Sequence, residues 1–356
     1  MNILKTTELT SYKQYIARKW FAMVVALGLL IMAALWSISA GSAGLTIPDI
    51  LEALFHKGAT KNSTIIWNVR LPRVCTAIAI GCGLAIAGCV MQNVLRNPMA
   101  SASTLGVSQG ACFGAAVGIV FFEGGIQVGN TEANFTVLNA GTVSTLAFCG
   151  GMITTLVILA LSRGRRSSPS TMVLAGVALS SIFSGMTTLI QYFADDVKTA
   201  SLVYWTFGSL SKANWQQIGI MAIMALIAFV YFYYNRLNFN AMEAGVATAK
   251  SLGVPVDRLT VVTMVLCALV ASVSVAFAGS IGFIGLIAPH IMRKFVGNDY
   301  RFLIPGSALG GAALLLLADV GSRTLMPPVV LPIGALTSFL GGPMFLYLCL
   351  KGGKRK

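Results

Sequence analysis

The chain has 356 residues and a formal net charge of +14 at pH 7, yet only 10% of its residues are charged and 56% are hydrophobic. Soluble domains carry about a quarter charged residues, so this composition excludes an ordinary soluble protein. The apolar residues come in blocks of about 20, which as helices would cross a hydrocarbon core roughly 30 Å thick. Because lipid offers no hydrogen-bond partners, such blocks must be helical. We predict an all-α, polytopic membrane protein.

Ten membrane spans are predicted in chain order. The first, 20–40, is longer than the apolar core of a signal peptide and is followed by further apolar blocks, so we expect it to be retained. The eighth, 280–298, is short and is interrupted by glycine and proline. The predicted limits are 20–40, 72–92, 100–122, 141–161, 172–193, 216–235, 259–278, 280–298, 303–321 and 331–350. They form one domain at 20–350, between an N-terminal segment at 1–19 and a basic tail at 351–356.

The distribution of basic residues predicts the orientation. With the N-terminus in the cytoplasm, 18 of the 25 Lys and Arg residues fall in cytoplasmic segments, as expected from the positive-inside rule. The cytoplasmic face then carries the whole net charge, and both chain ends lie on that side. A basic patch on a soluble domain would suggest nucleic-acid binding. Here membrane topology and contact with anionic lipid explain the charge, and no nucleic-acid partner is expected.

Glycine and proline spacing suggests how the helices are arranged. In the third predicted span, glycine recurs every fourth residue at Gly106, Gly110, Gly114 and Gly118. Residues four apart lie roughly on one helix face, so a neighbouring helix can approach closely there. A weak repeat also relates Gly88, Pro98 and Gly106 to Gly279, Pro289 and Gly297, each 191 residues later. This spacing suggests an inverted repeat of the kind common in transporters.

The sequence carries no motif for catalysis or metal binding. Neither G-x-x-x-x-G-K-[ST] nor H-E-x-x-H occurs, and the seven cysteines lack the paired spacing of a zinc site. We therefore expect no catalytic residue, no metal site and no cofactor in this chain. An ion-coupled transporter needs ionisable groups inside the membrane. The main candidate, Asp319, precedes Arg323 by four residues and is expected to pair with it on one helix face. The energy source should lie on a partner, with an ion-coupled secondary transporter as the alternative.

Several short motifs occur together in a specific order. They are Arg70–Arg73, Arg96–Met99, Leu105–Gly110, Leu174–Leu179, Gly208–Leu210, Ser251–Val254, Gly282–His290, Ala318–Asp319 and Leu331–Gly334. Each motif alone is weak. In this order, on ten predicted spans, they resemble the iron-chelate, haem and cobalamin permease family of ABC importers, and the similarity runs from about Trp20 to the end of the chain.

This resemblance implies a transport subunit of the cytoplasmic membrane rather than an enzyme. Family permeases have ten spans with both ends in the cytoplasm and work as pairs, so the partner would be a second copy or a close paralogue. Two cytoplasmic ATPase subunits would bind ATP and Mg, and an extracytoplasmic substrate-binding protein would dock outside. The imported substrate would be an iron chelate, such as a siderophore complex or haem, or cobalamin.

The resemblance assigns docking and gating roles to individual residues. Arg70, Arg73 and Arg323 match arginines that grip carboxylates on the binding protein, a role suited to guanidinium groups; anchoring at the membrane interface is the alternative. A second set matches positions at the inner gate, for which helix capping is the alternative. These gate residues are Asn97, Met99, Ser168 and Ser170.

The longest cytoplasmic loop, 236–258, matches the paired short helices that couple family permeases to the ATPase; an ordinary basic loop is the alternative. Its matching residues are Asn240, Gly245, Lys250, Ser251, Leu252 and Gly253. Two positions depart from the family pattern, which usually has glutamate at each. Val246 follows the glycine of this loop, with Glu243 nearby, and Val330 precedes the Leu331–Gly334 motif.

Overall fold

The computed structural model describes residues 2–40, 52, 61–122, 126–128, 135–137, 140–162, 169–327 and 329–352. The first half of the chain contains α1 (Asn2–Ser39), α3 (Lys61–Ile65), the π-helical turn η1 (Ile66–Arg70), α4 (Leu71–Val94), α5 (Val107–Phe121), β1 (Ile126–Val128), β2 (Phe135–Val137), α6 (Ala140–Ser162) and α7 (Pro169–Phe193). The second half contains α8 (Asp196–Thr206), α9 (Trp215–Tyr234), α10 (Arg236–Glu243), α11 (Val246–Ser251), α12 (Val256–Ala278), α13 (Ile284–Val296), α14 (Tyr300–Thr324) and α15 (Ile333–Gly352).

The helical architecture agrees with the prediction in its coarse form. Seven helices among the described residues are long and apolar enough to cross a membrane, and α5 and α15 contain shorter apolar stretches. At 13 residues, α13 is shorter still, so the count of ten membrane crossings stays a prediction. Among the described residues, β1 and β2 pair in a small antiparallel hairpin with Ile126 opposite Val137, and every other element is helical.

One boundary of the prediction is wrong for an identifiable reason. The third span begins at Val107 rather than near residue 100, because residues 97–106 form turns that end at Gly106 with φ 83°. Only glycine adopts such a backbone at little cost, and the helix begins directly after it. Helix α1 continues unbroken from Asn2 to Ser39, so the predicted N-terminal segment 1–19 is continuous with the first span, and its cytoplasmic location stays a prediction.

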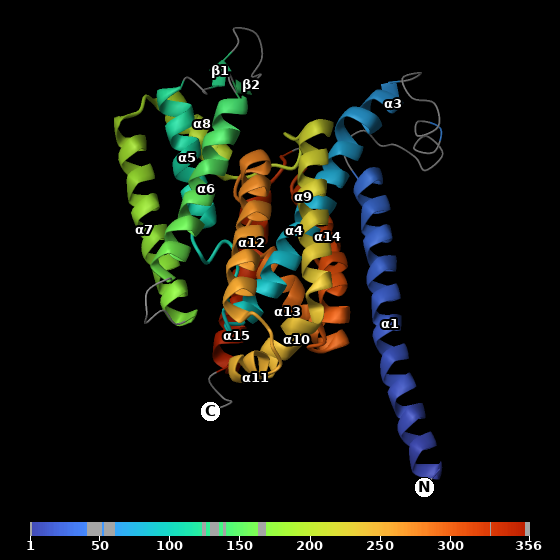
Figure 1. The fold of residues 1–356 in the computed structure, drawn as a ribbon. Helices are drawn as coiled ribbons and strands as arrows, with labels where there is room; N and C mark the ends of the chain where they lie inside the picture. Colours follow the sequence, from blue (N-terminus) through green and yellow to red (C-terminus); the bar gives the residue numbers. More distant parts are fainter. Residues whose placement is uncertain are drawn as a thin grey trace.

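Helix α4 forms the centre of the bundle. None of its residues is exposed, and it packs against α9, α12, α13 and α14 (Figure 1). Glycine makes two of these contacts possible. A Cβ atom at Gly88 would lie only 1.8 Å from the carbonyl oxygen of Gly285, and one at Gly81 would lie 2.6 Å from that of Gly311. The backbones of α4, α13 and α14 therefore approach at distances that no other residue permits.

The predicted glycine contact in the third span is confirmed. Helices α5 and α6 pack along each other. A Cβ atom at Gly110 would meet the carbonyl oxygen of Gly150 at 2.4 Å, and one at Gly114 would meet that of Leu146 at 2.0 Å. By contrast, the matched residues of the suggested repeat occupy different structural positions. Gly88 lies inside α4 whereas Gly279 ends α12, so these matches do not mark equivalent positions.

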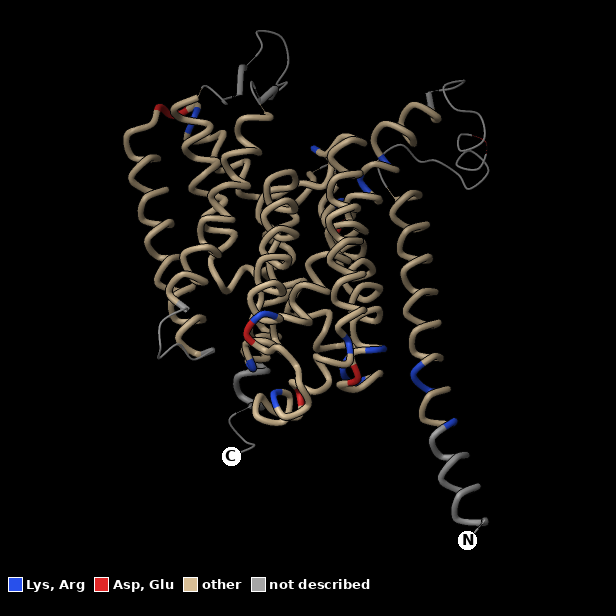
Figure 2. The backbone as a smooth tube through the Cα atoms, in the orientation of Figure 1, with Lys and Arg blue, Asp and Glu red and all other residues tan. Residues whose placement is uncertain are grey.

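The two ends of the bundle differ in character. Figure 1 shows that α1 begins and α15 ends at the end that carries α10 and α11, which we call the lower end. The opposite, upper end carries α8 and the last turn of α14. Charged residues gather near the two ends, and the middle of the bundle is almost free of them among the described residues (Figure 2). This pattern is the one expected of a protein whose middle lies in lipid.

Candidate functional site

A buried carboxylate organises the upper end. Asp319 of α14 is fully buried and accepts hydrogen bonds from Arg73 Nε of α4 at 2.7 Å and from Arg323 Nη2 at 2.8 Å. The predicted pair between Asp319 and Arg323 is therefore confirmed. The contact of Arg73 with Asp319 was not predicted, because the two residues lie 246 positions apart in the sequence.

The arginines also hold the end of α1. Arg70 donates to the backbone oxygens of Ile38 and Ser39, while Arg323 donates to the backbone oxygen of Ala40 at 2.8 Å. Cationic side chains bind the free carbonyl groups at a helix C-terminus favourably. The structure thus brings Arg70, Arg73 and Arg323 together, and it engages all three with acceptors inside the chain. Their docking to a binding protein stays a prediction.

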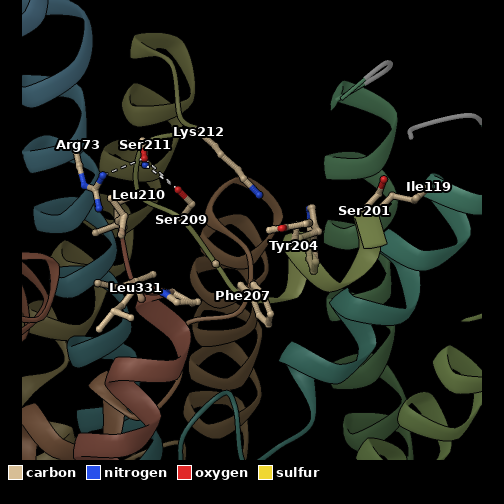
Figure 3. Close-up of a pocket in the computed structure, with 15 residues that line it drawn as sticks. Arg73, Ile119, Ser201, Tyr204, Phe207, Ser209, Leu210, Ser211, Lys212 and Leu331 are labelled. Atoms are coloured by element: carbon tan, nitrogen blue, oxygen red, sulfur yellow. Dashed lines mark hydrogen bonds between the residues drawn. The ribbon is translucent and has the colours of Figure 1, made fainter. Parts of the chain in front are cut away.

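An open pocket lies beside this arginine cluster at the upper end. Its volume is about 420 Å³, within the range of small-molecule sites. Figure 3 shows that Arg73 and the 209–212 segment form one side, and that Tyr204 and Ser201 of α8 form the other. The remaining lining residues are Ile119, Trp205, Phe207, Gly208 and 330–333.

Tight backbone contacts shape the pocket. After α8 the chain turns at Gly208, whose φ is 70° and where a Cβ atom would lie 2.7 Å from the backbone oxygen of Ser280. The amide of Ser209 then donates to the oxygen of Ala278 at 2.7 Å, and the amide of Gly334 donates to that of Phe207 at 3.1 Å. Of the lining residues, sequence reasoning singled out Arg73 for a role and Val330 as a departure from the family pattern. The Gly208–Leu210 and Leu331–Gly334 motifs, noted without a role, were the available signal for the rest.

Among the predicted gate residues, Asn97 and Met99 follow α4 directly. Both are half-buried, and the Asn97 side chain accepts a hydrogen bond from the amide of Met99 at 2.9 Å. This bond fits the local turn or capping alternative, and it leaves a gating role as a prediction. Ser170 is exposed in the first turn of α7, and Ser168 lies outside the described residues.

The predicted coupling loop folds as two short helices, α10 and α11, joined at Gly245 with φ 132°. A second glycine, Gly253 with φ 80°, reverses the chain before α12. At this reversal Ser251, Leu252 and Gly253 are exposed, and Leu252 shows 68% of its surface. An apolar side chain this exposed on a charged surface is unusual and suits an interface.

Asn240 fastens α10 to the bundle. Its amide donates to Asp299 at 3.1 Å, and its oxygen accepts from the backbone of Tyr300 at 2.9 Å. Asp299 also pairs with Arg301 at 2.8 Å and with Lys19 of α1 at 3.9 Å. Burial raises the pKa of Asp299, but hydrogen bonds from Arg301 and Asn240 outweigh it and lower the pKa to about 2. The carboxylate is therefore ionised at neutral pH and joins α1, α10 and α14.

Glu243 makes a second connection from α10. It accepts hydrogen bonds from Asn93 of α4 at 3.1 Å and from Asn298 at 2.9 Å. These residues line a polar pocket of about 410 Å³ at the lower end, next to Arg293, which donates to Gln92 at 2.8 Å. The loop thus contains an exposed carboxylate that binds Asn93 of α4, although Val246 stands where relatives usually have glutamate. Sequence reasoning missed Asp299 and Asn93, because their partners are distant in the chain.

Comparisons with known proteins identify the family. The model of the FecCD transport family matches residues 29–351. The chain belongs to this family. A Methanocaldococcus jannaschii protein assigned to the ABC transporter permeases is 48% identical, over 97% of this chain and 98% of its own length. The vitamin B12 import system permease protein of Escherichia coli is 36% identical over 92% of this chain and 94% of its own length.

The solved structures agree with the FecCD assignment. An inward-facing metal-chelate type ABC transporter superposes with a TM-score of 0.78 and 29% identity, covering 92% of this chain and 98% of that one. This FecCD member is a transport subunit in the cytoplasmic membrane, the permease of an ABC importer of the iron-chelate, haem and vitamin B12 class. Membership implies ATPase subunits and a substrate-binding protein as partners.

Proposed function

We propose that this permease carries an intact metal chelate, such as a siderophore complex, haem or cobalamin, into the cytoplasm as one half of a dimer. The observation that carries the proposal is the α10–α11 pair, with Leu252 exposed at its end and Asn240 and Glu243 bonded into the bundle. Such a pair can receive force from an ATPase and pass it to α4 and α14. The lower end is then cytoplasmic, as the charge distribution predicts.

The other predicted sites fit into one transport cycle. The binding protein docks at the upper end, where Arg70, Arg73 and Arg323 supply positive charge. Binding of ATP and Mg draws the two ATPase subunits together, and this movement shifts the α10–α11 pair. Asn97, Met99, Ser168 and Ser170 then form the inner gate. No step of this cycle requires a metal or cofactor held by the permease itself.

Reconstitution tests the proposal. Proteoliposomes containing the permease, its ATPase and its binding protein should take up a radiolabelled metal chelate only when ATP and Mg are present. An ionophore that collapses ion gradients should leave uptake unchanged, because the energy comes from nucleotide hydrolysis. Uptake that stops with the ionophore despite ATP would reject this proposal and favour an ion-coupled secondary transporter.

A further inference from the structure

The upper pocket has an unbalanced charge. Two of its lining residues, Arg73 and Lys212, are cationic, and none is acidic. The nearby Asp319 does not restore the balance, because it is fully buried and is shared between Arg73 and Arg323. Arg70 lies close to the same group. A pocket walled by one sign of charge concentrates ligands of the opposite sign.

Lys212 differs from the arginines in having no hydrogen-bond or ion-pair partner among the described residues. Its side chain extends from the 209–212 segment toward Tyr204 on the facing wall (Figure 3). Lys212 is exposed, so its ammonium group can reach a ligand in the open pocket, and partial desolvation by the surrounding atoms lowers its pKa. An anion placed beside it would form an ion pair that the described residues do not supply. Arg73, in contrast, is held in place by Asp319 and by Ser211, the latter at 3.2 Å.

The rest of the pocket suits an apolar body. Tyr204 and Phe207 present exposed aromatic rings, packed edge to face with centroids 6.0 Å apart. Leu210 and Ile333, which also line the pocket, are buried and add apolar surface to it. Offset aromatic stacking and cation contacts with an aromatic face both stabilise flat conjugated ligands. Cations on one wall and rings on the other therefore match a ligand with anionic oxygens on an aromatic or apolar frame.

We propose that this pocket receives an anionic arm of the imported chelate, with its catecholate or carboxylate oxygens on Lys212 and Arg73 and its frame against Tyr204 and Phe207. The proposal rests on the proposed function and narrows its substrate class to negatively charged metal chelates. Lys212 is a specificity-determining residue, since it favours these over neutral chelates of the same size. Lys212 is the better variant to test, because Arg73 also supports Asp319.

Two ferric complexes of similar size make the test direct. A ferric tricatecholate is trianionic, whereas a ferric trihydroxamate is neutral. Binding of each would be measured by quenching of tryptophan fluorescence, since Trp205 lines the pocket, with the permease–ATPase complex in nanodiscs. The parent should bind the tricatecholate more tightly. Lys212→Gln should weaken that binding about tenfold, the value of one charge-assisted contact, and Lys212→Glu should weaken it further. Trihydroxamate binding should not change.

Lys198→Gln is the matched control. It removes a positive charge from the same end of the bundle, at a residue that does not line the pocket, and it should leave both affinities unchanged. Equal affinity of the parent for the two complexes, or an equal loss for both in Lys212→Glu, would overturn the proposal. So would unchanged chelate binding with weaker binding-protein docking, which would reassign the pocket to that partner. If charge-selective binding holds but no chelate is imported, the proposed function fails instead.

Discussion

At the scale of the residue, the chain confines its strongest electrostatic interactions to a few positions. Asp319 is fully buried and pairs with two guanidinium groups, so an unpaired charge at this position would lower the stability of the fold. A buried ion pair is weak evidence of net stabilisation, but removing one partner leaves an uncompensated charge. Arg73 and Arg323 therefore depend on Asp319 to balance their charge.

Asp319→Asn should destabilise the permease by about 3–5 kcal/mol, because Arg73 and Arg323 lose their only described carboxylate partner. The measurement is thermal unfolding in detergent. The matched control is Asp257→Asn, which removes a carboxylate whose side chain is 91% exposed and whose pair with Lys250 is solvent-accessible. Exposed pairs contribute about 0–1 kcal/mol. Similar melting temperatures for the two variants would contradict the buried role of Asp319.

At the scale of the element, helix contacts depend on small residues. The contact of α5 with α6 is the clearest case, because the predicted glycine spacing appears in the structure as direct backbone approach. The same principle explains the contact of α4 with α13 at Gly88. Hydropathy predicted these helices well, since a long apolar block in lipid has no alternative to the helix.

Gly114→Ala should destabilise the protein by about 1–3 kcal/mol, because its methyl group would lie 2.0 Å from the backbone oxygen of Leu146 and the helices must separate. Gly141→Ala is the control, since nothing lies within 4 Å of a Cβ atom there. It should be neutral or slightly stabilising, as expected for alanine over glycine in a helix. Unfolding in detergent compares them, and equal stability of both variants would contradict the packing role.

Sequence reasoning failed at those elements that long-range contacts define. It did not predict α8, whose 11 residues have too little apolar character and length to stand out as a span. It placed the start of α5 too early, because composition does not reveal the positive φ of Gly106. The upper pocket and the Asp299 group combine residues from distant parts of the chain. No local pattern reports such contacts, so only the motif order pointed toward them.

At the scale of the whole molecule, the α10–α11 pair is the one described feature suited to receiving work from a partner. It ends in exposed residues and is connected through Asn240 and Glu243 to α14 and α4. Force applied at Leu252 would therefore reach the bundle through hydrogen bonds to both helices. Coupling between ATP hydrolysis and transport requires the whole complex. Its test must therefore measure the rate of ATP hydrolysis and the rate of uptake separately.

Gly253→Trp should uncouple the transporter. No atom lies within 4 Å of a Cβ atom at Gly253, so the chain can fold with a strain of about 1–2 kcal/mol from its φ of 80°. The indole would instead occupy the surface that meets the ATPase. Proteoliposomes should show uptake reduced at least tenfold while ATP hydrolysis continues. Gly28→Trp, at an equally open position in α1, should transport normally. Full uptake by Gly253→Trp would remove this loop from the coupling path.

The attachment of α1 has a mechanical consequence. Arg323 binds its upper end, and Lys19, midway along α1, lies 3.9 Å from Asp299 at the start of α14, so the helix is joined to α14 at two separate points. Two helices joined at two separate points resist sliding and tilting relative to each other. During each transport cycle we expect α1 and α14 to move together as one rigid unit. The movements that open and close the passage should then come from helices on the other side of the bundle.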